Sequence, residues 1–368
     1  MADPFHADGI VSSAAVLVEG LNVQAAVGGY RHTYFVDPIN GSDSNNGSSW
    51  SQAFLSAQAA VDQFESDKHD DYVGSALSPA AEIYGMNGLI MLGAGDHIPA
   101  DDTSPIIELH SWSADGATAG GNWGLTIMGV PGNNRAILMG GATNTANLIH
   151  IAGARGIRIL NLSFHRALQT ATTADIFLTD GDEVVNKTAA AASHHSLYCE
   201  IAGCDFLEDM AADSESSPAA IHTKSGKHLL IHHNRFGNRS TARGIIYQND
   251  NGNPGWIHIN DNYFAPCDLG AIQYVAAASA QDVEIFNNRF RRDGRTIAGA
   301  ALTMANAIDI PAGKAVEYQP LINNNLFMGW AALDNAGATD AIYDAQGTAV
   351  VDAGTDYMGN DTYNALSS

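Results

Sequence analysis

Apolar and polar positions alternate along a short phrase that recurs through the chain. The phrase is aliphatic-x-Ile-x-x-Asn-x-Phe, and its copies are IRILNLSF (Ile157–Phe164), CEIAGCDF (Cys199–Phe206), LLIHHNRF (Leu229–Phe236), IHINDNYF (Ile257–Phe264), VEIFNNRF (Val283–Phe290) and PLINNNLF (Pro320–Phe327). Apolar positions with a period of two before a turn indicate a strand. A fixed phrase with variable spacers indicates a solenoid, whose units bury their apolar faces against their neighbours. The sequence therefore predicts an all-β fold, a right-handed parallel β-helix.

Two positions of the phrase carry side chains that suit the interior of such a rod. The sixth position is Leu162 or Cys204 in two copies and asparagine in the others: Asn234, Asn262, Asn288 and Asn325. The last position is always phenylalanine: Phe164, Phe206, Phe236, Phe264, Phe290 and Phe327. An amide at a bend can donate to and accept from backbone groups of neighbouring coils. We expect an internal asparagine ladder and, just past the bend, a stacked phenylalanine column, both structural.

A second set of short strands precedes the phrase. Its members are LIHI (Leu148–Ile151), DIFL (Asp175–Leu178), AIHT (Ala220–Thr223), IIYQ (Ile245–Gln248) and AIQY (Ala271–Tyr274). Alignment on Ile149, Ile176, Ile221, Ile246 and Ile272 places the next residues on one outward stripe: His150, Phe177, His222, Tyr247 and Gln273. Aromatic and hydrogen-bonding side chains in a row suit a sugar chain, so the glycan-binding candidates are His150, His222, Tyr247 and Gln273. The alternative is an ordinary polar face of a solenoid.

Ionisable residues lie beside this stripe. Lys224 follows His222 by two residues, and the loop after Phe177 contains Asp180, Asp182 and Glu183. Paired carboxylates could do acid/base work at a glycosidic bond. A lyase would instead need a base and a cation that stabilises an enolate-like intermediate. The catalytic candidates are therefore Asp180, Asp182, Glu183, His222 and Lys224.

Histidine pairs and one acidic turn raise the question of a metal site. Adjacent residues on a strand point to opposite faces, so we expect His194-His195 and His232-His233 to be turn or loop histidines and not metal ligands. The oxygens of Asp37, Asn40 and Asp43 could surround Ca²⁺, although the same residue types dominate plain turns. The sequence predicts no cofactor, with Ca²⁺ in this turn as the alternative.

The chain divides into three parts. Residues 1–31 are rich in Ala, Val and Gly, and we expect an arm that docks on another protein or, alternatively, covers the open end of the rod. The rod spans residues 32–330, where SAQAAVDQF (Ser56–Phe64), with Ser56 as N-cap, predicts a short capping helix over the first coil. Residues 331–368 form a C-terminal cap, an extra strand or an oligomer contact.

Charge and composition narrow the partners. The chain has 17 Lys and Arg against 40 Asp and Glu, a net charge of −23. That field repels phosphate backbones and anionic membranes, although charge also maintains solubility. With no apolar run long enough to span a bilayer, we expect neither nucleic-acid binding nor membrane insertion. The amino-terminal residues lack the pattern of a secretory signal, so we expect synthesis in the cytoplasm.

Three cysteines are too few for a disulfide framework. They are Cys199, Cys204 and Cys267. Cys199 and Cys204 both fall on core positions of one copy of the phrase, so we expect buried free thiols.

At these residues the chain resembles the pectate-lyase-like superfamily of right-handed parallel β-helices. The opening YFVDPINGSDSNNGSSW (Tyr34–Trp50), followed by SAQAAVDQ (Ser56–Gln63), is similar to the start of many members. In those proteins a strand, a Gly-Ser-Asp-x-Asn-x-Gly turn and a capping helix precede the first coil. The resemblance covers residues 32–330 and is specific for fold. The superfamily includes pectate lyases, polygalacturonases, pectin methylesterases, phage tailspikes and non-enzymatic virion proteins.

Motifs of the enzymatic branches are missing from the sequence. It has no Asn-Thr-Asp followed by Asp-Asp, Gly-His-Gly and Arg-Ile-Lys, no Trp-x-Asp-His and no Gly-Tyr-Gln-Asp. Together with the apolar arm, this favours a structural surface protein of a tailed-phage virion: a decoration, head-fibre or spike component made in the host cytoplasm.

Such a protein would contact other virion proteins through residues 1–31, would self-associate, and could bind a cell-surface polysaccharide. One alternative is an extracellular polysaccharide lyase or glycoside hydrolase of the β-helix superfamily. Another is a self-associating adhesin or matrix protein.

Overall fold

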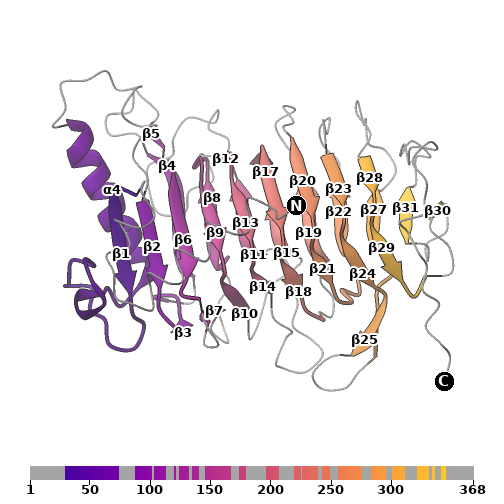
Figure 1. Cartoon of the computed structure of the whole chain (residues 1–368), viewed down its shortest axis with the longest axis horizontal. Coiled ribbons are helices and arrows are strands. Elements are labelled where there is room, and N and C mark those ends of the chain that lie inside the picture. The colour runs from indigo at the N-terminus through magenta and orange to yellow at the C-terminus, as the bar shows by residue number, and fades with distance from the viewer. Residues whose placement is uncertain are drawn as a thin grey trace, which may run out of the picture.

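The protein folds as a right-handed parallel β-helix, in which successive coils stack into a rod (Figure 1). This architecture confirms the fold predicted from the repeated phrase. The computed structural model describes residues 30–73, 88–101, 103–112, 120–121, 124–131, 135–140, 146–166, 174–179, 196–206, 219–224, 226–238, 243–248, 256–275, 283–295, 301–310, 321–330, 334–335 and 341–344.

Three sheets, here called A, B and C, form the walls of the rod, and their described strands pair in parallel except for one short antiparallel pair at an end of sheet C. Among the described residues, sheet A has nine strands in the order β1 (His32–Val36), β2 (Gly88–Leu92), β6 (Leu125–Gly129), β9 (Arg158–Leu160), β13 (Glu200–Ala202), β17 (Leu229–His232), β20 (Ile257–Asn260), β23 (Val283–Phe286) and β28 (Leu321–Asn323). The described part of sheet B runs β3 (Gly95–His97), β7 (Ala136–Gly140), β10 (Ser163–Arg166), β14 (Asp205–Phe206), β18 (Arg235–Phe236), β21 (Tyr263–Phe264), β24 (Arg289–Arg291) and β29 (Leu326–Met328).

Sheet C corresponds to the second strand set and continues past residue 330. Its described strands run β5 (Gly120–Gly121), β4 (Ile107–Trp112), β8 (Ile149–Ala152), β11 (Ala174–Thr179), β15 (Ala219–Thr223), β19 (Arg243–Gln248), β22 (Ile272–Val275), β27 (Ile308–Ile310), β31 (Ile342–Asp344) and β30 (Asp334–Asn335). Because β31 pairs in parallel with β27, part of the segment 331–368 extends the rod with an extra strand.

Two short ladders lie beside the main sheets. They pair β12 (Ser196–Leu197) in parallel with β16 (Gly226–Lys227), and β25 (Asp293–Arg295) in antiparallel fashion with β26 (Ala301–Thr303).

Each copy of the phrase spans a bend between sheets A and B. In β17, β20 and β23 the first and third residues are buried, as period-two alternation requires. The residue after each sheet A strand has a positive φ at six bends: Asn161, Gly203, His233, Asp261, Asn287 and Asn324. Left-handed backbone turns the chain sharply, so the next residue points inward and the phenylalanine begins sheet B.

The inward residue at the bend forms the asparagine ladder. The backbone N–H of Asn234 donates to Oδ1 of Asn262 at 3.0 Å, and that of Asn262 donates to Oδ1 of Asn288 at 3.0 Å. The amide of Asn262 also donates to the carbonyl of Ile231, and Asn288 continues the pattern to Asn325. All four asparagines are buried. Their side chains thus satisfy backbone groups at bends that have no sheet ladder.

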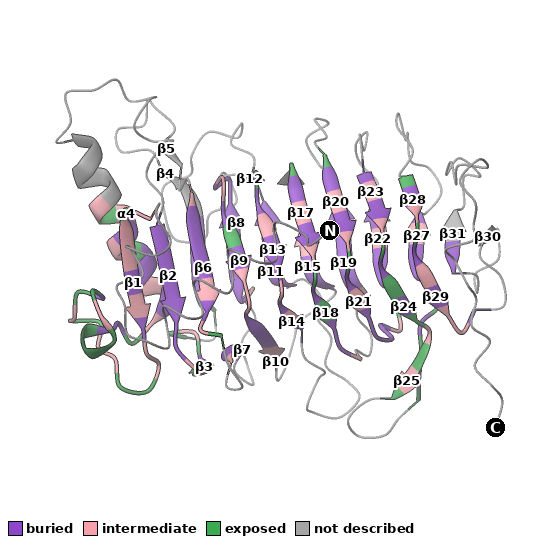
Figure 2. Ribbon diagram, viewed as in Figure 1, coloured by how far each residue is buried: buried purple, intermediate pink, exposed green. Residues whose placement is uncertain are grey.

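The phenylalanine column stacks along the interior of sheet B. The rings are buried, and neighbouring ring planes lie within 12° of parallel with centroids 4.4–5.0 Å apart: Phe164, Phe206, Phe236, Phe264, Phe290 and Phe327. Figure 2 shows that buried residues make up much of the strands along the rod. The column and the buried isoleucines make one continuous core.

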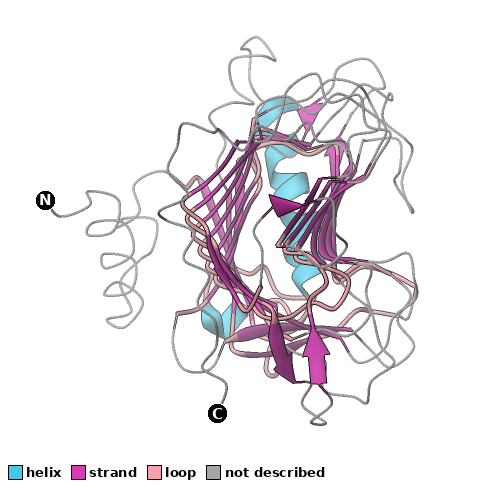
Figure 3. Cartoon of the chain, turned by 90° about the vertical axis from the view of Figure 1, so that its right-hand side faces the viewer, coloured by secondary structure: helices cyan, strands magenta, loops and turns pink. Residues whose placement is uncertain are grey.

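Helix α4 (Ala57–Val73) covers the first coil, preceded by the short 3-10 helix η1 (Trp50–Gln52). Ser56 caps α4, since its Oγ accepts the backbone N–H of Ala59 at 3.2 Å. Viewed along the rod, the helix lies across the interior at the far end (Figure 3). Val61 and Phe64 are fully buried there. The predicted helix is present and extends beyond the predicted end at Phe64.

The three cysteines are buried free thiols, as predicted for Cys199 and Cys204. Burial raises the pKa of Cys199 to about 12, so it stays protonated and unreactive at neutral pH.

Candidate functional site

The predicted stripe corresponds to an outward column on sheet C. The pairing register of the strands fixes its members. In register order the column reads Glu108, His150, Phe177, His222, Ile246, Gln273 and Asp309.

Tyr247 does not belong to this column, and the prediction that it faces outward is wrong. Ile221 pairs with Ile245, so Ile246 occupies the outward position and Tyr247 points into the core, where it is 3% exposed. Its ring packs edge-on against Tyr274. The sequence IIY contains two adjacent isoleucines, and alignment on the second one shifts the register by one residue. A shift of one residue moves every side chain of a strand to the other face.

His150 faces outward but is buried, at 2% exposure. Its Nε2 lies 2.9 Å from Thr179 Oγ1, and its Nδ1 lies 3.5 Å from Glu108 Oε1. Phe177 stacks on the ring at 5.6 Å. The expectation that His150 contacts a glycan is therefore wrong, because its polar atoms face protein groups and solvent does not reach it.

Three polar residues further along the sheet C column, His222, Gln273 and Asp309, are half-buried and contact protein groups. His222 Nε2 lies 3.1 Å from Gln248 Oε1, and Gln273 donates to Asp309 Oδ2 at 2.9 Å. Lys224 Nζ lies 5.4 Å from the centre of the Phe177 ring, a cation–π contact. The loop candidates Asp180, Asp182 and Glu183 lie outside the described residues. The structure therefore does not test the predicted catalytic set as a whole, and its role stays a prediction.

In the turn that contains Asp37 and Asp43, both carboxylates accept hydrogen bonds from backbone N–H groups. Asp37 Oδ1 accepts the N–H groups of Ile39 and Asn40, at 2.9 and 3.1 Å. Asp43 Oδ1 accepts those of Leu55 and Ser56. Burial opposes the charge of Asp37, yet these hydrogen bonds hold the pKa of its carboxyl below the usual value. This is the geometry of a plain turn, and Ca²⁺ binding stays an untested alternative.

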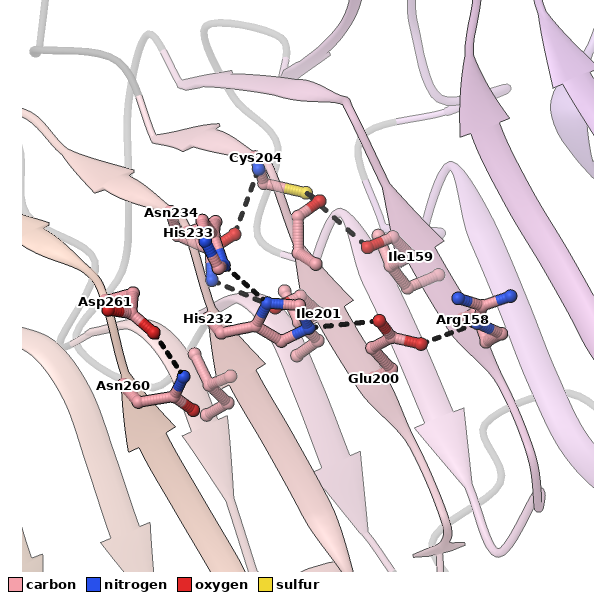
Figure 4. Close-up of polar contacts among 12 residues, drawn as sticks. Arg158, Ile159, Glu200, Ile201, Cys204, His232, His233, Asn234, Asn260 and Asp261 are labelled. Carbon is pink, nitrogen blue, oxygen red and sulfur yellow. Dashed lines mark hydrogen bonds and ion pairs between the residues drawn. The ribbon is translucent and has the colours of Figure 1, made fainter. Parts of the chain in front are cut away.

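A different group of polar side chains comes together on the outward face of sheet A. Arg158 Nε donates to Glu200 Oε2 at 2.5 Å, and His232 Nε2 lies 3.0 Å from Glu200 Oε1. Nδ1 of His232 lies 2.7 Å from Nδ1 of His233 (Figure 4). We call Arg158, Glu200, His232 and His233 the sheet A cluster. It is a continuous chain of hydrogen bonds across three coils, on strands β9, β13 and β17 and the bend after β17.

Glu200 is the centre of this cluster and is ionised. Burial alone would raise its pKa, but the hydrogen bonds from His232 and Arg158 outweigh that effect and lower the pKa from 4.5 to about 2. Because an ionised carboxylate only accepts hydrogen bonds, His232 Nε2 carries a hydrogen and donates it. When both rings are neutral, His232 Nδ1 then accepts from His233 Nδ1–H, and His233 Nε2 carries a lone pair.

The bend explains why the two histidines meet. His232 ends β17 and faces outward, whereas His233 is the left-handed residue of the bend, with φ of 55°. The rule that adjacent residues face opposite ways holds only for extended backbone. The prediction that these are turn histidines is right for His233, but the two rings converge. Within the described residues no cluster of three or more His, Cys, Asp or Glu side chains could hold a metal ion.

The outward face of sheet A continues in polar side chains towards the C-terminal end. On the next coils His258 Nε2 lies 3.6 Å from Glu284 Oε2, and Asn260 donates to Asp261 at 2.7 Å. These side chains come from β20, β23 and the bend after β20. The sheet thus presents partly exposed donors and acceptors over several coils, on strands whose backbone is fixed by parallel ladders.

Sequence reasoning missed this face although the phrase contains its signal. The residues flanking the invariant Ile must point outward, since the Ile points inward. Around Ile201 and Ile231 these positions hold Glu200 and His232. Five of the six left-handed bend residues are Asn, Asp or Gly, and the exception is His233. His233 is less suited to left-handed backbone than these residue types, and it lies beside the outward carboxylate of Glu200. This combination was the indication of a site that the sequence offered.

Comparisons with solved structures give low overall similarity. The crystal structure of the Agl-KA catalytic domain matches with a TM-score of 0.40 and 15% identity, over 67% of this chain and 37% of that one. A tailspike protein mutant of E. coli bacteriophage HK620 in complex with a pentasaccharide matches at 0.39 and 11%, over 77% and 56%. PfbA, a surface adhesin of Streptococcus pneumoniae, matches at 0.37 and 9%, over 74% and 81%.

This chain therefore spans 37% and 56% of the first two structures. No family model matches the chain, and no curated protein matches it. Within the described residues, no helix has the length and apolar character needed to cross a membrane. Similarities this low carry no argument about function, so the functional conclusion rests on the site.

Proposed function

We propose that the protein is a surface rod of a tailed-phage virion, a decoration, head-fibre or spike component, that binds a cell-surface glycan along the outward face of sheet A. The observation that carries glycan binding is the sheet A cluster, in which Arg158, Glu200 and His232 present donors and acceptors on adjacent rigid strands. Sugar hydroxyls both donate and accept, so a face that offers both suits them.

The rigidity of this face favours binding. The strands under the cluster are parallel neighbours, and the interior behind them is closed by buried isoleucines and by the asparagine ladder. Side chains on such a base lose little freedom when a ligand binds. The predicted stripe on sheet C is less suitable, because His150 is buried there and Ile246 interrupts the polar column.

Support for display on a virion comes from the sequence. An apolar segment precedes a stiff rod, and the motifs of the pectinolytic branches are missing. A net charge of −23 keeps such a surface from adhering to nucleic acid during assembly. Detection of peptides from this chain in gradient-purified phage particles would support this location, and their absence from the particles would refute it.

Glycan binding is tested by probing the full chain on an array of bacterial surface polysaccharides. His232→Ala removes the central ring of the sheet A cluster and should weaken binding at least about tenfold, the equivalent of about 1.4 kcal/mol. His222→Ala, on sheet C, is the matched control and should leave binding unchanged. Binding lost in His222→Ala and kept in His232→Ala would place the site on sheet C instead.

A second candidate, a polysaccharide lyase, is favoured by the order of groups in the sheet A cluster. His233 can accept a proton, His232 can share the resulting charge, and Glu200 orients His232. This is the logic of a base held by a second and a third group. The test is to incubate the protein with uronate polysaccharides and follow the absorbance of the unsaturated product. Turnover that disappears in His233→Ala would favour this candidate over binding alone.

A further inference from the structure

A column of turn residues lies just before sheet A and changes character along the rod. It is defined by the positions two residues before Thr126, Arg158, Glu200, Leu230 and His258, which are register partners in sheet A. In coil order the column reads Gly124, Gly156, Tyr198, His228 and Trp256. Two glycines are thus followed by three aromatic rings.

The aromatic half of the column is exposed. Tyr198 and Trp256 are each 58% exposed, and His228 is also exposed. Tyr198 and His228 stack with centroids 4.6 Å apart and planes 9° apart, and Trp256 lies 6.1 Å beyond His228. Because these rings stack on one another from one coil to the next, the face of each ring points along the axis of the rod. One face of Tyr198 is therefore covered by His228, and its other face looks towards the coil of Gly156.

The space in front of that second face holds no side chain from its own column. A Cβ atom built on Gly156 would lie 3.1 Å from the backbone N of Gly124, and no side chain of the described residues outside its chain neighbours comes within 4 Å of it. Gly156 and Gly124 both have positive φ, at 65° and 72°. Within the part of the chain that the structure describes, the column thus carries no side chain over two coils before the ring of Tyr198.

Tyr198 and His228 keep left-handed backbone that glycine adopts without strain. Their φ angles are 56° and 52°, in a column where two preceding coils use glycine. A large side chain in this conformation is strained, and a large exposed ring adds apolar surface to water. Neither feature stabilises the coil, so both favour a role outside folding.

Polar groups border the space between Gly156 and Tyr198 on the strand side. Arg158 follows Gly156 by two residues and Glu200 follows Tyr198 by two, and the two side chains form the ion pair of the sheet A cluster. The Arg158 side chain is 46% exposed. A flat aromatic wall beside donors and acceptors matches a pyranose ring, whose C–H face meets the negative face of an aromatic ring while its hydroxyls reach polar groups.

Charge selects among sugars. The carboxylate of Glu200 lies next to this space and is ionised, and the whole chain carries a net charge of −23. A uronate or sialic acid at this place would meet like charge. The chemistry thus favours a neutral sugar.

We infer that the space between Gly156 and Tyr198 is a binding subsite for one pyranose ring of a neutral glycan, stacked on Tyr198 and hydrogen-bonded to Arg158 and Glu200. The inference rests on the proposed function, since it names the sugar class and the stacking residue of that glycan site. His228 and Trp256 extend the aromatic row along the rod, so the glycan chain continues in that direction.

The chain itself offers the variants for the test. Tyr198→Gly restores the residue type that Gly156 and Gly124 have in the same column, so it removes the ring without adding backbone strain. Gly156→Asn does the opposite, because it adds a side chain to the glycine half of the column, and Asn tolerates left-handed backbone. Its Cβ would lie 3.1 Å from the backbone N of Gly124, so its melting temperature is measured beside its binding. Asn324→Gly is the matched control, since it makes the same backbone change in the bend column, on the coil of β28.

The probes are an array of neutral and of uronate- or sialate-bearing oligosaccharides, followed by titration calorimetry with the strongest neutral oligosaccharide. We expect the unaltered full chain to bind neutral probes. Tyr198→Gly and Gly156→Asn should each weaken binding at least about tenfold, which is about 1.4 kcal/mol. Asn324→Gly should bind normally, and the melting temperature of Tyr198→Gly should equal or exceed that of the unaltered protein.

The results that would contradict the subsite can be told apart from those that would contradict the proposed function. Equal binding by Tyr198→Gly and the unaltered protein would overturn the subsite and leave the proposed glycan function standing. Binding of the acidic probes alone would overturn the neutral class. No binding of any probe by the unaltered protein would overturn both proposals. A change of oligomeric state in Tyr198→Gly by light scattering, with glycan binding kept, would make the aromatic row a contact between copies and overturn the subsite.

Discussion

Asn262 lies in the middle of the interior ladder and bonds to the coils on both sides of it. Its amide donates to Ile231 and Asn288, and its Oδ1 accepts from the backbone and the side chain of Asn234. Every one of these groups is buried, so a lost partner cannot be replaced by solvent. The ladder therefore stabilises the bends as the sheets stabilise the walls.

Asn262→Leu should destabilise the rod by about 1–3 kcal/mol, because buried backbone groups lose their partners. Denaturant unfolding would measure the change. Asn260→Leu is the matched control, since Asn260 faces outward on the same coil and its side chain bonds only to Asp261 among the contacts described. Equal midpoints for the two variants would contradict the stabilising role of the ladder.

His97 makes the N-terminal coils sensitive to acid. It is 3% exposed, and its Nε2 lies 2.9 Å from the carbonyl of Gly93, so Nε2 carries the hydrogen and donates. Burial disfavours the charged ring and lowers its pKa below 6.5, although Gly93 and the charges of Asp37 and Asp96 act in the opposite direction. Since the unfolded state then binds the proton more readily than the folded state, stability should fall as pH drops below 6.5.

His97→Gln should reduce this loss of stability. Gln keeps a donor for the Gly93 carbonyl and does not titrate, so the melting temperature of the variant should vary less than that of the unaltered protein as pH falls through 6.5. Thermal melts of both proteins across this range provide the measurement. Parallel curves would show that His97 is not the group responsible.

The bend between sheets A and B has the same backbone conformation in every described copy of the phrase. A left-handed residue ends the sheet A strand, and the buried ladder residue follows it. At Asn287 the left-handed backbone can be studied separately from side-chain packing, because the Asn287 side chain is exposed. The strand before it, β23, pairs in regular register with β20 and β28. The conformation itself, and not packing, selects the residue at this position.

Asn287→Val should therefore destabilise the rod by about 1–2 kcal/mol, the cost of a left-handed conformation for a side chain with a branched Cβ. Asn287→Gly should be neutral or slightly stabilising at the same site. Chemical denaturation of the pair separates backbone strain from side-chain loss. A Val variant as stable as the Gly variant would exclude the left-handed bend.

The whole rod has one end covered by α4, and its first described residue lies on the outward face of sheet A. The hydroxyl of Tyr30 donates to Thr126 Oγ1 at 3.0 Å, and its ring packs in a small cluster with Leu89 and Met91. Tyr30 thus belongs to the rod. The predicted arm, residues 1–31, lies outside the described residues except for its last two.

Deletion of residues 1–29 should leave a folded rod that no longer incorporates into phage particles, if this segment attaches the protein to the virion. Circular dichroism melts would report folding, and immunoblots of purified particles would report incorporation. Normal incorporation of the shortened chain would refute attachment through the arm. Collapse of the shortened rod would favour the alternative, a cover for the solenoid end.

The order of residues along the chain was sufficient to predict the coils, the ladder and the stack. Asn234 and Phe236 could be assigned because their partners occupy the same place in the next copy of the phrase, and a stacked fold brings equal places together. Sheet C was harder, since Ile245 and Ile246 fit the inward position equally well by sequence. The burial of Tyr247 against Tyr274 settles the register.

The sequence by itself thus determined the fold, because a period-two core with a repeated bend has one way to bury its apolar residues. Only the tertiary structure decided which polar residues form a site. Arg158, Glu200 and His232 come from three coils, and Gly156 lies beside an aromatic ring only because Tyr198 is on the next coil. Side-chain contacts between coils depend on spacer lengths and on bend angles, and neither is encoded in the repeated phrase.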